Sequence, residues 1–209
     1  DEGKLLEIYT ELEFKAWTEE LKNKRGLSSE QTSVSEPQAY VSKEPPDVSS
    51  EINYEVILEL SHLKKWITKI TNSELLAIDT ETDGLDYMSA KLIGISMSVK
   101  PNSAAYIPLG HDYLGAPEQL DKELVLNQLR PILENPYVKK VGQNIKFDMS
   151  VFRQHGINLC GISFDTMLES YVINSIATRH DMDSLASTYL NVVTTKFSDV
   201  AGKGAKKLT

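Results

Sequence analysis

The order of apolar and polar positions divides the 209 residues into three stretches. In residues 1–21, apolar side chains recur near helical spacing, at Leu5, Tyr9, Leu12 and Trp17. This spacing predicts one amphipathic helix, which is too short to build a core of its own. Residues 22–52 are rich in Ser, Pro, Glu and Lys, which bury little apolar area, so we expect a flexible linker there. Residues 53–209 carry the longer apolar patterns and are the predicted folded domain.

Within this domain, strand-like and helix-like patterns alternate. Strands are predicted at 54–58, 74–81, 91–99, 103–108 and 138–142. Helices are predicted after Ser61 and near 120–134, 146–154, 164–175 and 183–190. Ser61, Asp165 and Asp183 are the expected N-caps, because each opens a helical pattern. The alternation predicts an α/β fold with a mixed sheet covered by helices.

The first candidate for chemistry is the pair Asp79 and Glu81, at the end of a predicted strand. Alternate residues of a strand share one face, so the two carboxylates should lie roughly 6 to 7 Å apart. A divalent cation bound by hard oxygen ligands would offset their repulsion. Two other interpretations exist. The pair marks the solvated end of a strand, or it opens a calcium loop, which is rejected because the twelfth loop position is Ala90 and not Glu.

A second acidic motif, Gly142-Gln143-Asn144-Ile145-Lys146-Phe147-Asp148, follows about seventy residues later as a strand, a turn and the start of a helix. With Asp79-Thr80-Glu81-Thr82-Asp83 and the stretch from Phe164 to Ala186, it closely resembles the proofreading exonuclease domain of bacterial DNA polymerase I. The resemblance extends from Asn53 to Thr209. It implies a ribonuclease-H-like fold, which periodicity alone does not name.

The resemblance also implies a mechanism with two divalent cations, Mg²⁺ or Mn²⁺, with Zn²⁺ allowed at one position. Asp79 would bridge both ions, Glu81 would hold the ion that activates water, and Asp148 would support the second ion, partly through water. Such a pair of ions neutralises charge on the entering and leaving oxygens of a phosphodiester. The implied substrate is a single-stranded or frayed 3′ end of DNA.

Six further residues are implied to contact that strand: Thr82, Leu85, Gln143, Asn144, Arg179 and Phe197. An aromatic face stacks on any base and an arginine pairs with phosphate, so the residue types suit this role. Structural alternatives stay open for three of them. Leu85 could close a turn, Asn144 could cap the next helix and Phe197 could pack into a core.

The net charge of -8 weighs against a protein that coats duplex DNA by charge alone. Residues 1–52 carry 12 acidic and 6 basic side chains, whereas residues 53–209 carry 18 and 16, so the excess lies mostly outside the domain. Cys160 is the only cysteine, so an internal disulfide is impossible. No apolar run approaches the roughly 18 residues of a membrane span. We expect no membrane partner, a monomer, and a bacterial cytoplasmic, nucleoid-associated location.

The family completes its site with a third motif, a Tyr followed four residues later by an Asp, and this sequence reaches Thr209 without it. We therefore expect a piece of a larger protein, with a polymerase domain in the same parent chain and residues 1–21 as the tail of a 5′-nuclease domain. The activity of the isolated piece stays open. Two alternatives remain: an RNA-processing 3′-to-5′ exonuclease, and a non-catalytic module that binds single strands or spaces neighbouring domains.

Overall fold

The computed structural model describes residues 1–24, 52–176 and 179–195. Contacts divide the chain into two units, Asp1–Val41 and Ser42–Thr209. The described part of the first unit holds two helices, α1 (Glu2–Glu11) and α2 (Lys15–Lys24), so the prediction of one helix is wrong.

The break between α1 and α2 has a local cause. Glu13 has a positive φ of 55°, which ends the first helix, and the chain then reverses so that three aromatic rings meet. The Tyr9, Phe14 and Trp17 ring centroids lie 5.0–6.1 Å apart. These rings form the small apolar contact that a single straight helix would not bring together.

The second unit is built on a six-stranded sheet, ordered β1-β4-β3-β2-β5-β6. Its strands are β1 (Asn53–Val56), β2 (Leu76–Thr82), β3 (Leu92–Lys100), β4 (Ser103–Pro108), β5 (Lys140–Gly142) and β6 (Ile162–Asp165). The β2, β3 and β4 strands pair antiparallel, whereas β1 on β4, β5 on β2 and β6 on β5 are parallel. The mixed sheet predicted from the sequence is therefore present.

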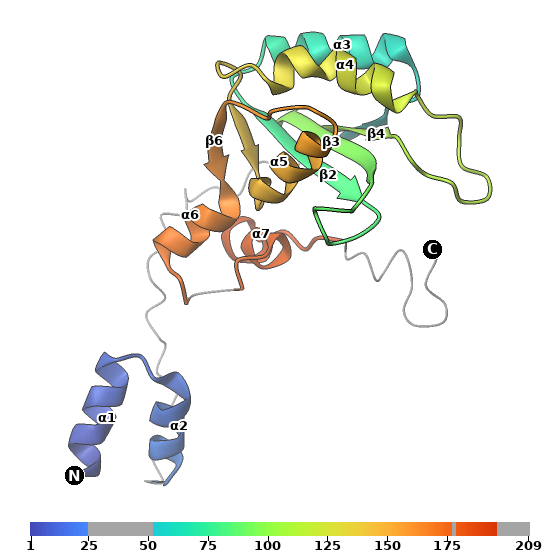
Figure 1. Ribbon diagram of the computed structural model, residues 1–209. Helices are drawn as coiled ribbons and strands as arrows, with labels where there is room; N and C mark the ends of the chain where they lie inside the picture. The colour runs from blue at the N-terminus through green and yellow to red at the C-terminus, as the bar shows by residue number, and fades with distance from the viewer. Residues whose placement is uncertain (25–51, 177–178, 196–209) are drawn as a thin grey trace. The chain divides into compact units, whose positions relative to one another are not determined.

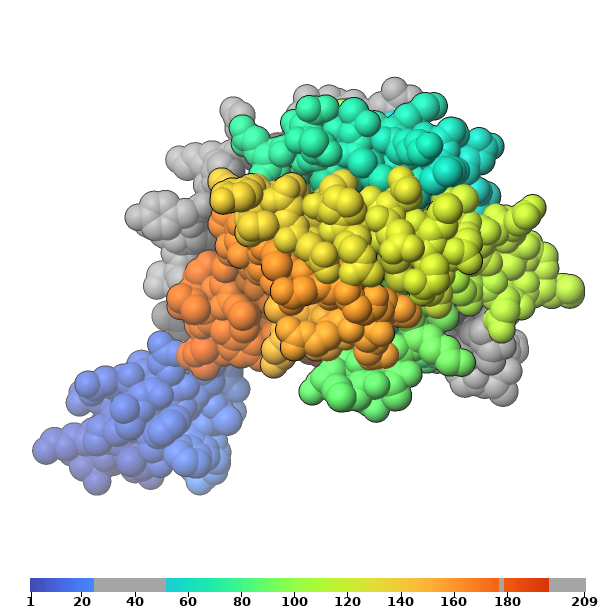
Figure 2. Space-filling model, turned by 45° about the horizontal axis from the view of Figure 1, so that its top comes forward, coloured from blue at the N-terminus to red at the C-terminus, as the bar shows by residue number. Residues whose placement is uncertain are grey.

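Three amphipathic helices pack on this sheet: α3 (Leu60–Thr71), α4 (Lys122–Leu133) and α5 (Ile145–Gln154). Figure 1 shows α3 and α4 side by side, with α6 (Thr166–Ile173) and α7 (Met182–Leu190) at the other end of the unit. In Figure 2 the surface of α4 continues into the neighbouring α5 segment, where Arg130 donates to the Gly156 carbonyl at 2.6 Å. Among the described residues, no helix is long and apolar enough to cross a membrane.

The two faces of the sheet differ in their burial. Leu76, Ile78 and Thr80 of β2 are buried, and the two apolar residues join the core formed with the three helices. The intervening Ala77 and Asp79 are only half-buried and Glu81 is exposed. Because side chains alternate along a strand, Asp79 and Glu81 lie on the face opposite the helical layer, which we call the site face.

Three local predictions are wrong. Helix α3 begins at Leu60 after Glu59, and the Ser61 hydroxyl lies 3.2 Å from the Glu59 carboxylate instead of capping the helix. The stretch predicted as helix from 164 starts with strand β6. Helix α7 is capped by Asp181, whose carboxylate accepts from Ser184 N at 2.8 Å, so Asp183 lies inside the first turn.

Strand β5 contains a fully buried lysine. The Lys140 ammonium donates to the carbonyls of Val138 at 2.8 Å and Asn135 at 3.2 Å. These bonds compensate in part for the loss of water, and burial lowers the pKa of Lys140 to about 8. Lys140 thus secures the loop that leads from α4 into the sheet.

Candidate active site

The carboxylates of Asp79 and Glu81 are presented by the central strand. Asp79 pairs with Ser96 and Glu81 with Gly94 on β3, so both side chains stand over small neighbours. The register shifts between Glu81 and Thr82, a bulge that bends the strand where pairing with β3 ends. The predicted placement of the two carboxylates on one face of a strand end is therefore present.

Asp148 is brought to this strand by helix α5. Strand β5 pairs with only Leu76 and Ala77 of β2, so the next part of that edge has no strand beside it. Asp148 lies there, and its Oδ1 accepts from the backbone N–H of Thr80 at 2.8 Å and from the Thr80 hydroxyl at 2.6 Å. The third predicted carboxylate thus binds the residue that separates Asp79 from Glu81.

The proximity of the three acids is visible in their electrostatics. Burial, the Asp148 charge and the Glu81 charge together raise the pKa of Asp79 from 3.8 to about 7. Burial also raises the pKa of Asp148, against the two hydrogen bonds from Thr80, which favour its charged form. Without a cation, these groups repel each other in a partly desolvated place.

A fourth acid, Asp165, fixes the frame around the site. Its carboxylate accepts from Asn144 N and Ile145 N at the start of α5, at 3.1 and 3.0 Å. The same carboxylate accepts from Met167 N and Leu168 N at the start of α6, at 3.0 and 3.2 Å. The predicted N-cap is confirmed, and it caps two helices at once. The orientation of α5, and with it Asp148, depends on this shared anion.

The turn before α5 holds two of the predicted strand-contact residues. Asn144 is the N-cap residue of α5, as the capping alternative has it, but its φ is positive at 57° and its side chain makes no cap bond. Gln143 donates from its amide to the His180 carbonyl at 2.8 Å, and its amide oxygen accepts from the Thr166 hydroxyl. A side-chain amide has two donor hydrogens and two acceptor lone pairs, so these two bonds do not exclude a nucleotide contact by Gln143.

The remaining predicted contacts fall in three separate stretches of the chain. Leu85 is 94% exposed in the β2–β3 connection, and the Thr82 hydroxyl donates to the Gly84 carbonyl at 2.7 Å. The Arg179 side chain is exposed and lies 3.4 Å from the Asp181 carboxylate. Phe197 lies outside the described residues.

Sequence reasoning missed Thr80 and the second helix capped by Asp165. Thr80 could have been found from the sequence, because it lies between the candidate ligands Asp79 and Glu81. A hydroxyl at that position can donate a hydrogen bond to a third candidate ligand, here Asp148. Sequence reasoning also missed Tyr106 of β4, which lies in one row with Ser96 and Asp79 on the site face. Tyr106 gave no sequence signal, because only the strand register places it there.

The donor set fits a divalent cation in kind. Asp79, Glu81 and Asp148 offer hard anionic oxygens of the type that Mg²⁺ and Mn²⁺ prefer, and the raised pKa of Asp79 reflects its burial together with the neighbouring negative charges. In the described ranges, however, no group of three or more His, Cys, Asp or Glu side chains is arranged so that it could hold a metal ion. The three acids are neighbours whose carboxylates do not yet converge.

Solved structures share this architecture. The chain is similar to Escherichia coli RNase D, an exoribonuclease involved in structured RNA processing, with 18% identity and a TM-score of 0.52 over 68% of this chain and 35% of that one. Pol1 from M. smegmatis, solved with DNA primer-template and dNTP, gives 18% identity and a TM-score of 0.56 over 67% and 23% of the two chains. Brucella melitensis NrnC with bound Mg²⁺ gives 20% identity and a TM-score of 0.50 over 75% and 70%. The fold is therefore ribonuclease-H-like, as expected.

Sequence comparison specifies the family. A profile described as 3′-5′ exonuclease matches residues 54–209, and the chain belongs to this family. It is 44% identical over 207 residues to the DNA polymerase I of Pseudomonas aeruginosa, covering 98% of this chain and 22% of that protein. The DNA polymerase I of Rhizobium leguminosarum is 36% identical over 75% of this chain and 17% of its own length. The chain thus spans about a fifth of these relatives.

Proposed function

We propose that residues 53–209 are the proofreading 3′-to-5′ exonuclease region of a bacterial DNA polymerase I, and that they hydrolyse the 3′-terminal phosphodiester of single-stranded or frayed DNA. Residues 1–21 would then be the tail of the preceding 5′-nuclease domain and 22–52 the linker. The observation that carries this proposal is the pair of hydrogen bonds from Thr80 to Asp148, which joins two acidic motifs 68 residues apart.

Each residue has a physical role in this reaction. Asp79, Glu81 and Asp148 would hold two divalent cations, Mg²⁺ or Mn²⁺. When bound, such cations neutralise the phosphate charge and lower the pKa of the attacking water. Thr80 keeps Asp148 against strand β2, and Asp165 keeps helix α5 in place. In a site without cations, the pKa of Asp79 is raised to about 7 by burial and by the neighbouring charges. Below that pH Asp79 carries a proton, which it must release before it can bind a metal.

The residues proposed to contact the DNA strand are supported by their exposure or by their position near the acidic residues. Leu85 is exposed and would lie beside a terminal base, and the exposed Arg179 guanidinium can exchange its Asp181 contact for a phosphate. Gln143 and Asn144 lie in the turn that precedes Asp148, and the Thr82 backbone lies at the bulge after Glu81. Phe197 is assigned by the family resemblance alone.

The parent protein would synthesise and repair DNA in the bacterial cytoplasm, at the nucleoid, with the polymerase domain on the same chain. The similarity to curated DNA polymerase I sequences supports this assignment. An RNA-processing exonuclease is the second candidate, because the RNase D fold is shared. A spacer or strand-binding module without catalysis is the third.

The decisive experiment is Mn²⁺-dependent shortening of a 5′-labelled single-stranded DNA oligonucleotide by the purified chain at pH 8. Stepwise loss of 3′ nucleotides should disappear in Asp148→Ala and persist in Asp86→Ala, which removes a carboxylate outside the proposed set. An RNA oligonucleotide of the same sequence should be a poorer substrate. Shortening that survives Asp148→Ala would refute the assigned site.

Inactivity of the chain has two meanings, which a longer version of the protein separates. A chain that extends through the Tyr and Asp motif should be active if the site needs the Asp of that motif as a further metal ligand. Catalytic groups that act as a unit lose most of their effect when one of them is missing. Inactivity of both chains, with metal-independent DNA binding that Asp79→Ala leaves unchanged, would favour the strand-binding module.

A further inference from the structure

A tyrosine on the site face lies beside the proposed metal ligands. Tyr106 of β4 pairs with Ser96 of β3, which in turn pairs with Asp79 of β2. In the next row along the sheet, Pro108 pairs with Gly94 and Gly94 pairs with Glu81. The two candidate ligands therefore lie in two adjacent rows, and Tyr106 lies two strands from Asp79 in the first row.

The Tyr106 ring lies over Gly94, which belongs to the neighbouring row that contains Glu81. A Cβ atom built on Gly94 would lie 2.0 Å from the Tyr106 hydroxyl oxygen and 2.4 Å from its Cζ. The hydroxyl thus occupies the place that a Gly94 side chain would take. Directly opposite residues of an antiparallel pair have Cβ positions about 5 Å apart, so this hydroxyl lies next to the base of the Glu81 side chain.

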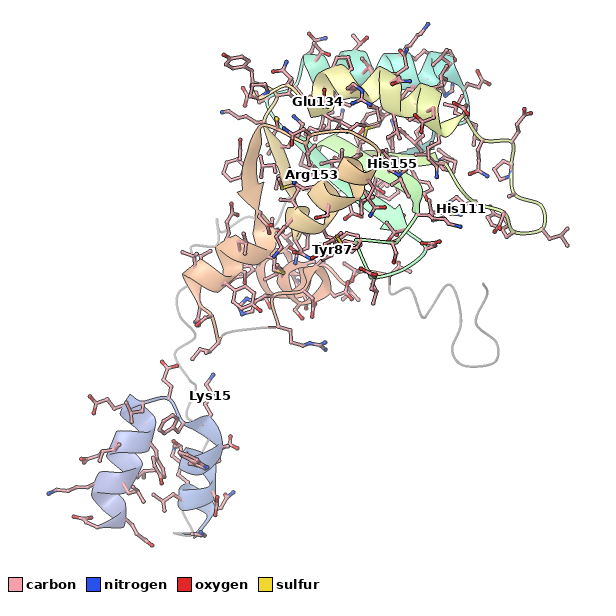
Figure 3. All side chains as sticks on the ribbon, in the orientation of Figure 1. Lys15, Tyr87, His111, Glu134, Arg153 and His155 are labelled. Atoms are coloured by element: carbon pink, nitrogen blue, oxygen red, sulfur yellow. The ribbon has the colours of Figure 1, made fainter. Side chains whose placement is uncertain are left out.

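The Tyr106 hydroxyl is held in place by His111. Tyr106 Oη lies 2.6 Å from His111 Nε2, and the two rings meet edge to face with centroids 5.8 Å apart. His111 is itself fixed through its backbone, because its N–H donates to Gln119 Oε1 at 2.9 Å and its carbonyl accepts from Gln119 Nε2 at 2.6 Å. Figure 3 shows His111 at the base of the loop that extends from the sheet.

The direction of the phenolic hydrogen depends on the His111 tautomer. When His111 carries its proton on Nε2, it donates to the Tyr106 oxygen and leaves the phenolic hydrogen free to point along the site face. A tyrosine phenol is protonated at neutral pH. A protonated phenol beside a carboxylate is a hydrogen-bond donor.

We propose that Tyr106 is a positioning residue for Glu81: its hydroxyl, braced by His111 and admitted by the missing side chain of Gly94, directs the Glu81 carboxylate toward Asp79 for cation binding. This inference rests on the proposed function. Glu81 is exposed at the end of β2, and the strand bulges directly after it. A bond from Tyr106 would restrict the orientation of this carboxylate where the strand itself does not.

The test is binding of Mn²⁺ to the purified chain at pH 8, with the electron paramagnetic resonance signals of free and bound ion as the readout. Tyr106→Phe should weaken binding about tenfold, the usual effect of losing a partner of a metal ligand. Tyr137→Phe is the matched control, because that side chain is 91% exposed and its hydroxyl loss should leave the affinity unchanged. Thermal melting of each variant verifies that it folds.

A double-mutant cycle separates positioning from general packing. If Tyr106 acts through Glu81, then Tyr106→Phe added to Glu81→Gln should change the Mn²⁺ affinity less than about twofold. A full, additive loss in that background would overturn the inference, and so would wild-type affinity in Tyr106→Phe alone. Failure of the wild-type chain to bind Mn²⁺ would overturn this inference. The proposed function would fail with it only if a chain extended through the Tyr and Asp motif also failed to bind Mn²⁺.

Discussion

Replacing Asp79 by Asn should stabilise the chain in the absence of divalent cations. The carboxylate of Asp79 is half-buried among like charges, which raises its pKa from 3.8 to about 7. Each unit of pKa shift corresponds to about 1.4 kcal/mol, so a fully desolvated group would contribute about 4 kcal/mol. Because Asp79 remains partly exposed, solvent screening reduces the expected effect to about 2 kcal/mol.

The sign follows from proton binding. A carboxyl group whose pKa is raised by folding binds protons more tightly in the folded state, so its contribution favours folding below the unfolded pKa. That contribution is lost as pH rises from about 4 and is gone once pH has passed the folded pKa of about 7. The advantage of Asp79→Asn over wild type should therefore grow between pH 4 and pH 8, by about 2 kcal/mol.

The assay is urea denaturation in EDTA at pH 4, 6 and 8, followed by far-ultraviolet circular dichroism. Asp86→Asn is the matched control, because Asp86 is fully exposed and hydrogen bonds from Ser89 and Met88 lower its pKa, which reverses the direction of the trend. Saturating Mg²⁺ at pH 8 should stabilise wild type and not Asp79→Asn. Parallel stability curves for wild type and Asp79→Asn across this pH range would refute the reasoning.

Three other outcomes are expected. Thr80→Val should destabilise the chain by about 2 kcal/mol in urea denaturation, and by much less on top of Asp148→Asn, because the lost hydroxyl bond is to that carboxylate. Asp165→Ala should cost about 2 to 3 kcal/mol and raise amide hydrogen exchange at the first turns of both α5 and α6; exchange confined to one helix would contradict the shared cap. Leu85→Ala should leave the melting temperature unchanged and weaken binding of single-stranded DNA in fluorescence anisotropy, whereas the equally exposed Leu114→Ala should change neither.

The sheet was largely predictable because its strands carry regular apolar alternation. The predicted strand at 103–108 matches β4 in full, and the predicted strand at 91–99 differs from β3 by one residue at each end. Strand β6 was missed because it is only four residues long at an edge of the sheet, where burial does not enforce alternation. The break at Glu13 was missed because a positive φ at a non-glycine residue leaves no sequence signal.

The candidate site was predictable in its residues and not in its connections. Asp79, Glu81 and Asp148 follow from the motifs, and their role as metal ligands stays a prediction. The bonds from Thr80 to Asp148 depend on where α5 docks against β2, which periodicity cannot give. The placement of Tyr106 depends on the registers of two strand pairs, each of which a shift by one residue would invert.

Lys139 and Lys140 are consecutive, yet the first side chain is exposed and the second is fully buried. A reagent that acylates amines therefore reaches Lys139 in the folded chain at once and Lys140 only after β5 has left its neighbours. The two residues lie on the same short peptide, so mass spectrometry reads both modifications from one fragment. The ratio of the two modifications over time then reports how often the strand beside the acidic cluster opens.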